Sequence, residues 1–204
     1  MQGIRIAVLV SGGGTNLGAL IDAQKEGILK SGEIVLVVSN KKEVYALTRA
    51  KENGIKTNVV LSENTAQKDF EKQLIEVLTA EKIELIILAG FMKILSKSFT
   101  DTYKNKIINV HPSLIPSFCG KNFYGLKVHK SALMYGVKIT GATTHFVNEI
   151  PDGGEIIMQK AVNIDRNYTP EELQQKVMRE AEWLILPLSA EKVCKQMLGE
   201  KQNV

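Results

Sequence analysis

Cysteine is scarce in this chain of 204 residues, which contains only Cys119 and Cys194. The two lie far apart and form no Cys-x-x-Cys motif, so the sequence predicts free thiols rather than a disulfide framework. Long apolar runs are also missing. The first apolar segment, residues 4–10, is too short to span a bilayer and lacks a secretory cleavage pattern. We therefore predict a cytoplasmic protein that has no membrane partner.

Dense charge of one sign is absent as well. The formal net charge is +4, and the lysine and arginine residues are scattered among aspartate and glutamate. This pattern argues against a nucleic-acid-binding protein and suits small anionic substrates better. No repeat, low-complexity tract or linker interrupts the chain, whose length fits one α/β domain or two small lobes that share a sheet. The oligomeric state stays open between monomer and homodimer.

Strand-like and helix-like segments alternate through the first half of the chain, in the order of βαβ units. This alternation predicts an α/β fold with a doubly wound, mostly parallel, Rossmann-like sheet. The predicted strands of this half are residues 4–10, 34–38, 57–60, 84–89 and 107–111. Helices are predicted from the end of the first strand to about residue 29, and at residues 43–52, 66–81 and 96–104.

The second half predicts a different arrangement. After a helix at 125–135, residues 139–147 and 155–163 have the pattern of two strands joined by a turn, a hairpin that would extend the sheet. A long C-terminal helix opens with a capping box that starts at Thr169. We expect its apolar stripe to pack on the sheet and Pro187 to kink it. The stripe consists of Leu173, Val177, Ala181, Leu184 and Leu188.

The first strand ends in a glycine-rich turn that contains Gly12, Gly13 and Gly14. Glycines let a ligand approach the backbone, and the free amide groups at the start of the next helix attract phosphate. The turn lacks the lysine of a Walker loop and the third glycine of the dinucleotide motif, and no acidic residue follows the second strand. A monophosphate is therefore favoured over NAD. A plain connecting turn is the alternative, and Lys41 and Lys42 could suit NADP.

Two polar side chains, Asn109 and His111, end the apolar strand at 107–111 and share one face because strands have a two-residue period. A neutral imidazole can accept a proton, and an imidazolium and an amide can both donate hydrogen bonds to an oxyanion. The alternative is a hydrogen-bonded core histidine. Asp152 lies in a Pro-Asp-Gly-Gly turn, where it is either a turn former or a carboxylate that raises the His111 pKa.

The two remaining histidines carry weaker signals. His145 either lines the same space as His111 or packs in the core, whereas His129 lies in a lysine-rich segment and is expected at the surface. A zinc site of His111, His145, Asp152 and Cys119 lacks close ligand spacing, so no metal is predicted. Ser113 lacks the Gly-x-Ser-x-Gly motif of a serine nucleophile.

Several motifs together resemble the folate-dependent formyltransferases, and their order and spacing match nearly the whole chain. They are Ser-Gly-Gly-Gly-Thr-Asn at 11–16, Leu-Ala-Gly-Phe-Met-Lys-Ile-Leu at 88–95, Asn-Val-His-Pro-Ser-Leu-Ile-Pro at 109–116, Thr-His-Phe-Val at 144–147, and Asp-Gly-Gly at 152–154 followed by Ile-Ile-Met-Gln. The resemblance implies a one-carbon transferase of purine biosynthesis. It would move the formyl group of 10-formyltetrahydrofolate, the co-substrate, to the amine of 5′-phosphoribosylglycinamide.

The resemblance also implies roles for individual residues. One formyltransferase domain would fill residues 1–204, with the phosphate-binding half at 1–100 and the catalytic and folate-binding half at 101–204. The implied catalytic residues are Asn109, His111 and Asp152. The implied substrate-binding residues are Gly12, Gly13, Gly14, Thr15, Asn16, Pro112 and Glu182. The implied cofactor-binding residues are Met92, Lys93, Ile94, Leu95, Asn109 and Val147.

The chain departs from the family pattern in three places. Lys93 stands where arginine is common, and Gln67, with Lys68 beside it, replaces a basic residue that some relatives use for the cofactor. The segment 119–124 is longer than in some relatives and is either a mobile loop over the substrate entrance or a surface insertion.

Alternative functions remain open. They are formyltetrahydrofolate hydrolase, another folate-dependent formyltransferase, an NAD-dependent oxidoreductase, and a non-catalytic nucleotide- or folate-binding module. Because the first strand begins at residue 4, we expect no N-terminal regulatory domain of the hydrolase kind. The length likewise argues against the transfer-RNA and sugar-nucleotide formyltransferases, which usually carry additional C-terminal sequence.

Overall fold

The computed structural model describes residues 3–202, so the first two and last two residues of the expected domain lie outside the described residues. Its centre is a seven-stranded sheet with the order β3-β2-β1-β4-β5-β6-β7. The first five strands are parallel, and β6 and β7 run antiparallel to their neighbours. The predicted α/β fold, with a doubly wound sheet extended by a hairpin, is confirmed.

The elements follow the predicted alternation closely. The strands are β1 (Ile4–Val10), β2 (Gly32–Ser39), β3 (Lys56–Val59), β4 (Leu85–Leu88), β5 (Ile107–His111), β6 (Ile139–Phe146) and β7 (Ile156–Asn163). The helices are α1 (Thr15–Lys25), α2 (Tyr45–Glu52), α3 (Gln67–Ala80), α4 (Lys97–Thr102), α5 (Leu126–Tyr135), α6 (Pro170–Val177) and α7 (Trp183–Gln202), with a π-helical segment (Met178–Glu182) between the last two.

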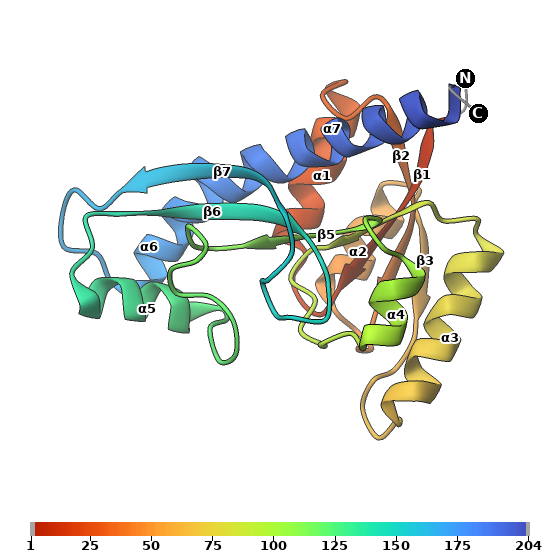
Figure 1. The fold of residues 1–204 in the computed structure, drawn as a ribbon, viewed down its shortest axis with the longest axis horizontal. Helices are drawn as coiled ribbons and strands as arrows, with labels where there is room; N and C mark the ends of the chain where they lie inside the picture. The colour runs from red at the N-terminus through yellow and green to blue at the C-terminus, as the bar shows by residue number, and fades with distance from the viewer. Residues whose placement is uncertain (1–2, 203–204) are drawn as a thin grey trace.

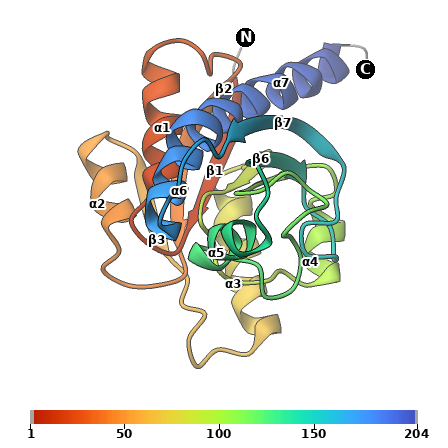
Figure 2. The same ribbon diagram turned by 90° about the vertical axis from the view of Figure 1, so that its left-hand side faces the viewer.

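Both faces of the parallel sheet are covered by helices. Helices α1, α2, α6 and α7 pack on one face, and α3 and α4 on the other (Figures 1 and 2). Each face has its own hydrophobic core. Along β1, Ile6 and Val8 belong to the core under α1, α2, α6 and α7, whereas Ala7 and Leu9 belong to the core under α3 and α4. A strand buried on both faces reads as a continuous apolar run, which is why the sequence predicted β1 so clearly. The hairpin of β6 and β7 projects beyond this block beside α5 and α6 (Figure 1).

The C-terminal helix differs from its predicted packing. The capping box at Thr169 is present, and Leu173, Val177 and Ala181 are fully buried as expected. Leu184 and Leu188 are instead 48% and 45% exposed. The π-helical segment Met178–Glu182 explains the error, because its wider turn shifts the buried face by about one residue. The buried positions after it are therefore Ile185 and Ser189 in place of Leu184 and Leu188.

Within residues 3–202, no helix combines the length and apolarity needed to cross a membrane. Pro187 lies inside α7, where it removes one backbone donor only a few residues after the π-helical segment.

Candidate active site

The order of the parallel strands reverses between β1 and β4, and ligands of open α/β sheets bind at the carboxyl ends of such strands. Ser11, which follows β1, ties three loops together there. Its hydroxyl donates to Asn40 Oδ1 at 2.7 Å and accepts a hydrogen bond from the Met92 amide at 2.9 Å. The glycine-rich turn after β1 and the Met92 segment after β4 are therefore fixed relative to one another.

The glycine-rich turn has the geometry of an anion cradle. Gly14 is the N-cap of α1 and has a left-handed backbone with φ of 72°. A side chain at this position would also place its Cβ 2.7 Å from the Cβ of Ala46, so only glycine fits. Gly12 and Gly13 are exposed, with no atoms within 4 Å of an added Cβ. The turn therefore leaves room for a ligand beside the start of α1, where helix amides lack intrahelical partners.

The start of α1 is linked to the end of the chain. The side-chain amide of Asn16 donates to Glu182 Oε2 at 2.9 Å, and both residues are buried. Burial raises the pKa of Glu182 to about 6, although the bond from Asn16 lowers it in part. Glu182 ends the π-helical segment, a type of irregularity that often accompanies functional sites. Thr15 is exposed at the first position of α1.

At the end of β5, the antiparallel partner adds a histidine to the site. Asn109 lies opposite His145 of β6, and the Asn109 amide nitrogen is 3.2 Å from His145 Nε2. His145 Nδ1 lies 2.8 Å from the Phe146 carbonyl oxygen. A carbonyl only accepts, so Nδ1 carries hydrogen, and in a neutral ring Nε2 accepts from Asn109. The second amide hydrogen of Asn109 is then free for a ligand.

The turn between β6 and β7 brings Asp152 to the two histidines. Its carboxylate oxygens lie 3.4 Å from His111 Nδ1 and 3.6 Å from His145 Nε2. The turn can approach β6 this closely because a Cβ on Gly154 would lie 1.7 Å from the Phe146 carbonyl oxygen. The β6–β7 pairing also shifts register between Thr144 and His145, directly beside the site.

Burial controls the charge of the pair. Burial lowers the pKa of His111 below its usual value, and the neighbouring Asp152 carboxylate only partly opposes this. Asp152 therefore raises the His111 pKa, as expected from the sequence, but burial has the larger effect and the net shift is downward. For Asp152, burial raises the pKa, but the contacts with His145, His111 and the Gly120 amide outweigh burial, so the net shift is downward. The resting pair is a neutral imidazole beside a carboxylate.

The segment after β4 presents apolar side chains next to this pair of strands. Met92 and Ile94 are 55% and 67% exposed, whereas Leu95 packs in the core and offers a ligand only its backbone. Lys93 and Val147 are half-buried. The exposed apolar side chains fit a flat organic ligand such as a pteridine.

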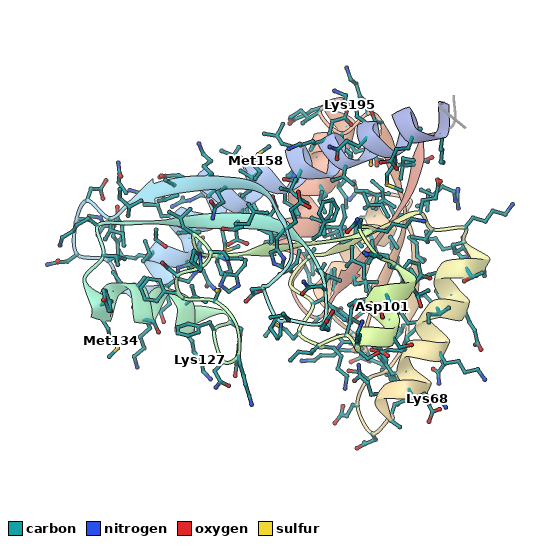
Figure 3. All side chains as sticks on the ribbon, viewed as in Figure 1. Lys68, Asp101, Lys127, Met134, Met158 and Lys195 are labelled. Carbon is teal, nitrogen blue, oxygen red and sulfur yellow. The ribbon has the colours of Figure 1, made fainter. Side chains whose placement is uncertain are left out.

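A buried carboxylate that the sequence did not reveal holds this segment in place. Glu71 of α3 accepts hydrogen bonds from the Ser96 amide and hydroxyl, and from the side chain of Gln67. Gln67 also donates to the Ile94 carbonyl oxygen at 2.9 Å. Its side chain thus binds the protein rather than open space, while Lys68 lies exposed at the outer end of α3 (Figure 3). The helical spacing of Gln67, Glu71 and Leu74 could have indicated this inward face.

Two further histidine positions differ in how well they were foreseen. His129 is fully buried, not exposed as expected, and burial lowers its pKa to about 4. The surrounding lysines misled the sequence-based prediction, because His129 lies on the inner side of α5 with Val128 and Ala132. For His145 the sequence does not decide between the site and the core. The strand pairing places it directly opposite Asn109, and this brings it into the site.

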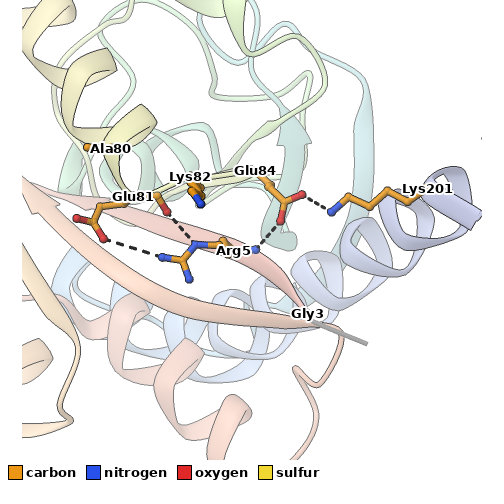
Figure 4. Close-up of a pocket in the computed structure, with 7 residues that line it drawn as sticks. All are labelled: Gly3, Arg5, Ala80, Glu81, Lys82, Glu84 and Lys201. Atoms are coloured by element: carbon orange, nitrogen blue, oxygen red, sulfur yellow. Dashed lines mark hydrogen bonds and ion pairs between the residues drawn. The ribbon is translucent and has the colours of Figure 1, made fainter.

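The hollow at the opposite end of the sheet is a separate feature. It is lined by Gly3, Arg5, Ala80, Glu81, Lys82, Glu84 and Lys201 (Figure 4). Most of its charges are engaged with one another, since Arg5 binds Glu81 and Lys201 of α7 binds Glu84. Arg5 lies near the start of β1 and Glu84 directly precedes β4, so the hollow lies away from the carboxyl ends that carry Asn109 and His111. Within residues 3–202, no group of three or more His, Cys, Asp or Glu side chains is arranged so that it could hold a metal ion.

This fold, with ionisable side chains clustered at the strand ends, is typical of an α/β enzyme. The formyl transferase family matches residues 4–188, and the chain belongs to that family. The resemblance that the motifs predicted is therefore confirmed.

The individual relatives are named as phosphoribosylglycinamide formyltransferases, as glycinamide ribonucleotide transformylase or as purine biosynthetic proteins. Phosphoribosylglycinamide formyltransferase of Haemophilus influenzae is 39% identical over 98% of this chain and 92% of its own length. The crystal structure of glycinamide ribonucleotide transformylase 1 from Symbiobacterium toebii has a TM-score of 0.88 and 35% identity, covering 95% of this chain and 89% of that one. The trifunctional purine biosynthetic protein adenosine-3 of Gallus gallus is 44% identical over 93% of this chain, which spans only 18% of that protein. The chain spans 61% of the chloroplastic Arabidopsis thaliana enzyme.

Proposed function

We propose that this protein transfers the formyl group of 10-formyltetrahydrofolate to the amine of 5′-phosphoribosylglycinamide, and so acts in purine biosynthesis. The proposal rests on the convergence of Asn109, His111 and Asp152 at the carboxyl end of β5. The Gly14 cradle follows β1, so it lies at the same carboxyl end of the parallel strands. The names of relatives that cover most of the chain support formyl transfer with phosphoribosylglycinamide as the acceptor.

The acceptor's phosphate binds the turn of Gly12, Gly13 and Gly14 and the exposed start of α1 at Thr15, where backbone amides supply hydrogen bonds. Asn16 and Glu182 bind the neighbouring part of the acceptor, because they join this cradle to the inner side of the C-terminal helices. Pro112, directly after His111, borders the acceptor's reactive end.

The folate lies against the segment of Met92, Lys93, Ile94 and Leu95, with Val147 and Asn109 on the other side. Met92 and Ile94 supply exposed apolar surface, and the backbone groups of the segment bind the polar edge of the ring. Bound there, the folate supplies the formyl carbon. Because Ser11 fixes the Met92 segment to the phosphate turn, the two substrates are held in a constant relation, which favours reaction by proximity.

The reaction joins the amine nitrogen to the formyl carbon and breaks the bond from that carbon to the folate nitrogen. Charge develops on the formyl oxygen, where the free amide hydrogen of Asn109 and the positive charge of protonated His111 stabilise it. His111 is neutral at rest, and Asp152 supplies the countercharge when the ring takes up a proton. The proton lost by the amine reaches the folate nitrogen through a water held by Asp152.

The test mixes the purified protein with 10-formyltetrahydrofolate, with and without 5′-phosphoribosylglycinamide, and follows folate deformylation together with the mass of the acceptor. We expect deformylation only with the acceptor, which gains one formyl group. Deformylation without the acceptor would identify a hydrolase instead. Tight binding of both compounds without turnover would identify a binding module.

The same proposal includes the remaining sequence-based predictions. The protein acts in the cytoplasm on small molecules, as a monomer or homodimer, and uses no metal. One formyltransferase domain carries both halves of the site, with phosphate binding in the first hundred or so residues and catalysis in the remainder.

A further inference from the structure

The loop between β5 and α5 turns back to the two catalytic candidates. The Phe118 carbonyl oxygen lies 2.9 Å from His111 Nε2, and the Gly120 amide donates to Asp152 Oδ2 at 2.8 Å. Two backbone groups, two residues apart, thus hold one member of the pair each. We propose that the segment 118–120 positions His111 and Asp152 for catalysis. This inference rests on the proposed function and assigns the loop a role other than that of a lid or a surface insertion.

The first contact selects the reactive nitrogen of His111. A carbonyl oxygen only accepts hydrogen bonds, so the Phe118 carbonyl requires a hydrogen on Nε2. The lone pair of the neutral ring is then on Nδ1, which faces Asp152 Oδ2 at 3.4 Å. A proton taken up by His111 therefore arrives at the nitrogen beside the carboxylate. Without the Phe118 carbonyl, the ring could adopt the other tautomer and lose this arrangement.

The second contact orients the carboxylate and keeps it charged. The Gly120 amide binds Asp152 Oδ2, and a hydrogen bond to the charged form lowers a carboxyl pKa. The other oxygen, Oδ1, then points to His145. Gly120 has a φ of 82°, and Phe118 and Asp152 also have left-handed backbones, with φ of 50° and 58°. Such conformations are uncommon for residues with side chains, so surrounding contacts must maintain them.

An aromatic cluster supplies those contacts. The ring of Phe118 packs edge to face against Phe123 of the same loop, at 6.3 Å between centroids, and against Tyr135 of α5, at 6.1 Å. Tyr135 belongs to the last turn of α5, so the cluster fastens the loop to a regular element. Phe123 therefore helps to anchor the backbone that holds His111.

The decisive experiment compares Gly120→Ala with the control Gly54→Ala. Gly54 follows the C-terminal end of α2. The two glycines have left-handed φ values of 82° and 70°, and neither has an atom within 4 Å of an added Cβ. Both variants thus carry similar backbone strain, but only Gly120 binds Asp152. For Gly120→Ala we expect kcat to fall roughly ten- to a hundredfold with little change in the KM of the acceptor. The acid limb of its kcat profile should move to higher pH, because the Asp152 pKa rises when the amide moves away.

A second pair of variants tests the anchor. Phe123→Ala removes an edge contact of Phe118, whereas Tyr124→Ala removes a half-exposed ring that contacts Lys127. We expect a lower kcat for Phe123→Ala and an unchanged kcat for Tyr124→Ala. The positioning role would be overturned if Gly54→Ala lowered kcat as much as Gly120→Ala and Tyr124→Ala as much as Phe123→Ala. The proposed formyl transfer would be unaffected by that result.

A measurement on the ligand-free protein is independent of activity. Nitrogen-15 spectra of the histidine rings, with His111 assigned by comparison with His111→Asn, report which ring nitrogen carries hydrogen. We expect the Nε2–H tautomer at neutral pH. Hydrogen on Nδ1 in the neutral ring would overturn the inference even if the enzyme transfers formyl groups. If the wild type transfers none, this spectrum still decides the role of Phe118.

Discussion

The two parts of the candidate site are built in opposite ways. The proposed phosphate cradle consists of consecutive residues, and its shape follows from the left-handed backbone of Gly14 and its close approach to Ala46. The candidate catalytic cluster combines β5, β6, the turn before β7 and the loop before α5. The comparison teaches that a substitution in the cradle should act locally on binding, whereas the cluster depends on strand register and on backbone groups far along the chain.

The largest effect is expected for Asp152→Asn, which keeps the shape of the side chain and removes its charge. Turnover should fall about a hundred- to ten-thousandfold, the range typical of acid–base groups, while the KM of the acceptor stays near its wild-type value. Steady-state kinetics with both substrates measure this. Asp165→Asn is the matched control, because Asp165 is exposed and pairs with Lys176 at the surface. A loss of less than fivefold for Asp152→Asn would remove this residue from the mechanism.

Gly14→Ala should affect the cradle without altering the cluster. The left-handed backbone costs an alanine about 1–2 kcal/mol, and the clash with Ala46 adds roughly 1–3 kcal/mol. The KM of the acceptor should rise more than kcat falls. Gly27→Ala is the control, since Gly27 has a φ of 73° against 72° for Gly14 but no atom within 4 Å of an added Cβ. Urea unfolding of Gly14→Ala and Gly27→Ala measures how much the clash with Ala46 adds to the loss of unfolding free energy. Equal losses in the two variants would show that Ala46 shifts to make room for the added Cβ.

His129 should make the protein sensitive to acid. Burial lowers its pKa from 6.5 to about 4, so the unfolded chain binds a proton between these values and the folded chain does not. This contribution to stability is present above pH 6.5 and is lost as the pH falls toward 4, by about 3 kcal/mol in total. His129→Leu should remove this dependence. Unfolding free energies of both proteins at pH 4.5 and 7 test it, and parallel curves would contradict the buried, neutral ring.

Glu182 should act with the opposite sign. Its folded pKa of about 6 lies above the ordinary value of 4.5, so the folded chain holds the extra proton in that window. Stability is therefore lost as the pH rises from 4.5 to 6, by about 2 kcal/mol. Glu182→Gln keeps an acceptor for Asn16 and should gain stability relative to wild type as the pH rises. An unchanged difference between pH 4.5 and 7 would mean that Glu182 is ionised throughout.

Most of the fold followed from local patterns. Apolar runs such as residues 4–10 predicted the strands, and the capping box predicted the start of α6. The error at Leu184 and Leu188 arose because a π-helical segment has no clear sequence signature. His129 was misplaced because lysines surround it in sequence, although it lies on the buried side of its helix.

The candidate site divides in the same manner. Alternation along β5 correctly placed Asn109 and His111 on a shared face, and the glycine spacing indicated the cradle. The roles of these residues stay predictions. Nothing local indicated that Glu71 holds the Ser96 segment or that the Phe118 carbonyl binds His111, because backbone groups are the same in every residue and only the folded chain decides their partners.

The amino-acid sequence by itself determined the elements, their order and the chemistry of the side chains, since propensity, periodicity and turn residues act over a few neighbours. Tertiary structure alone decided which of those side chains meet and in what protonation state. The separation of His111 from Asp152 and the depth at which both are buried depend on how β5 pairs with β6 and on the turn that follows β6, and this packing sets the local electrostatics.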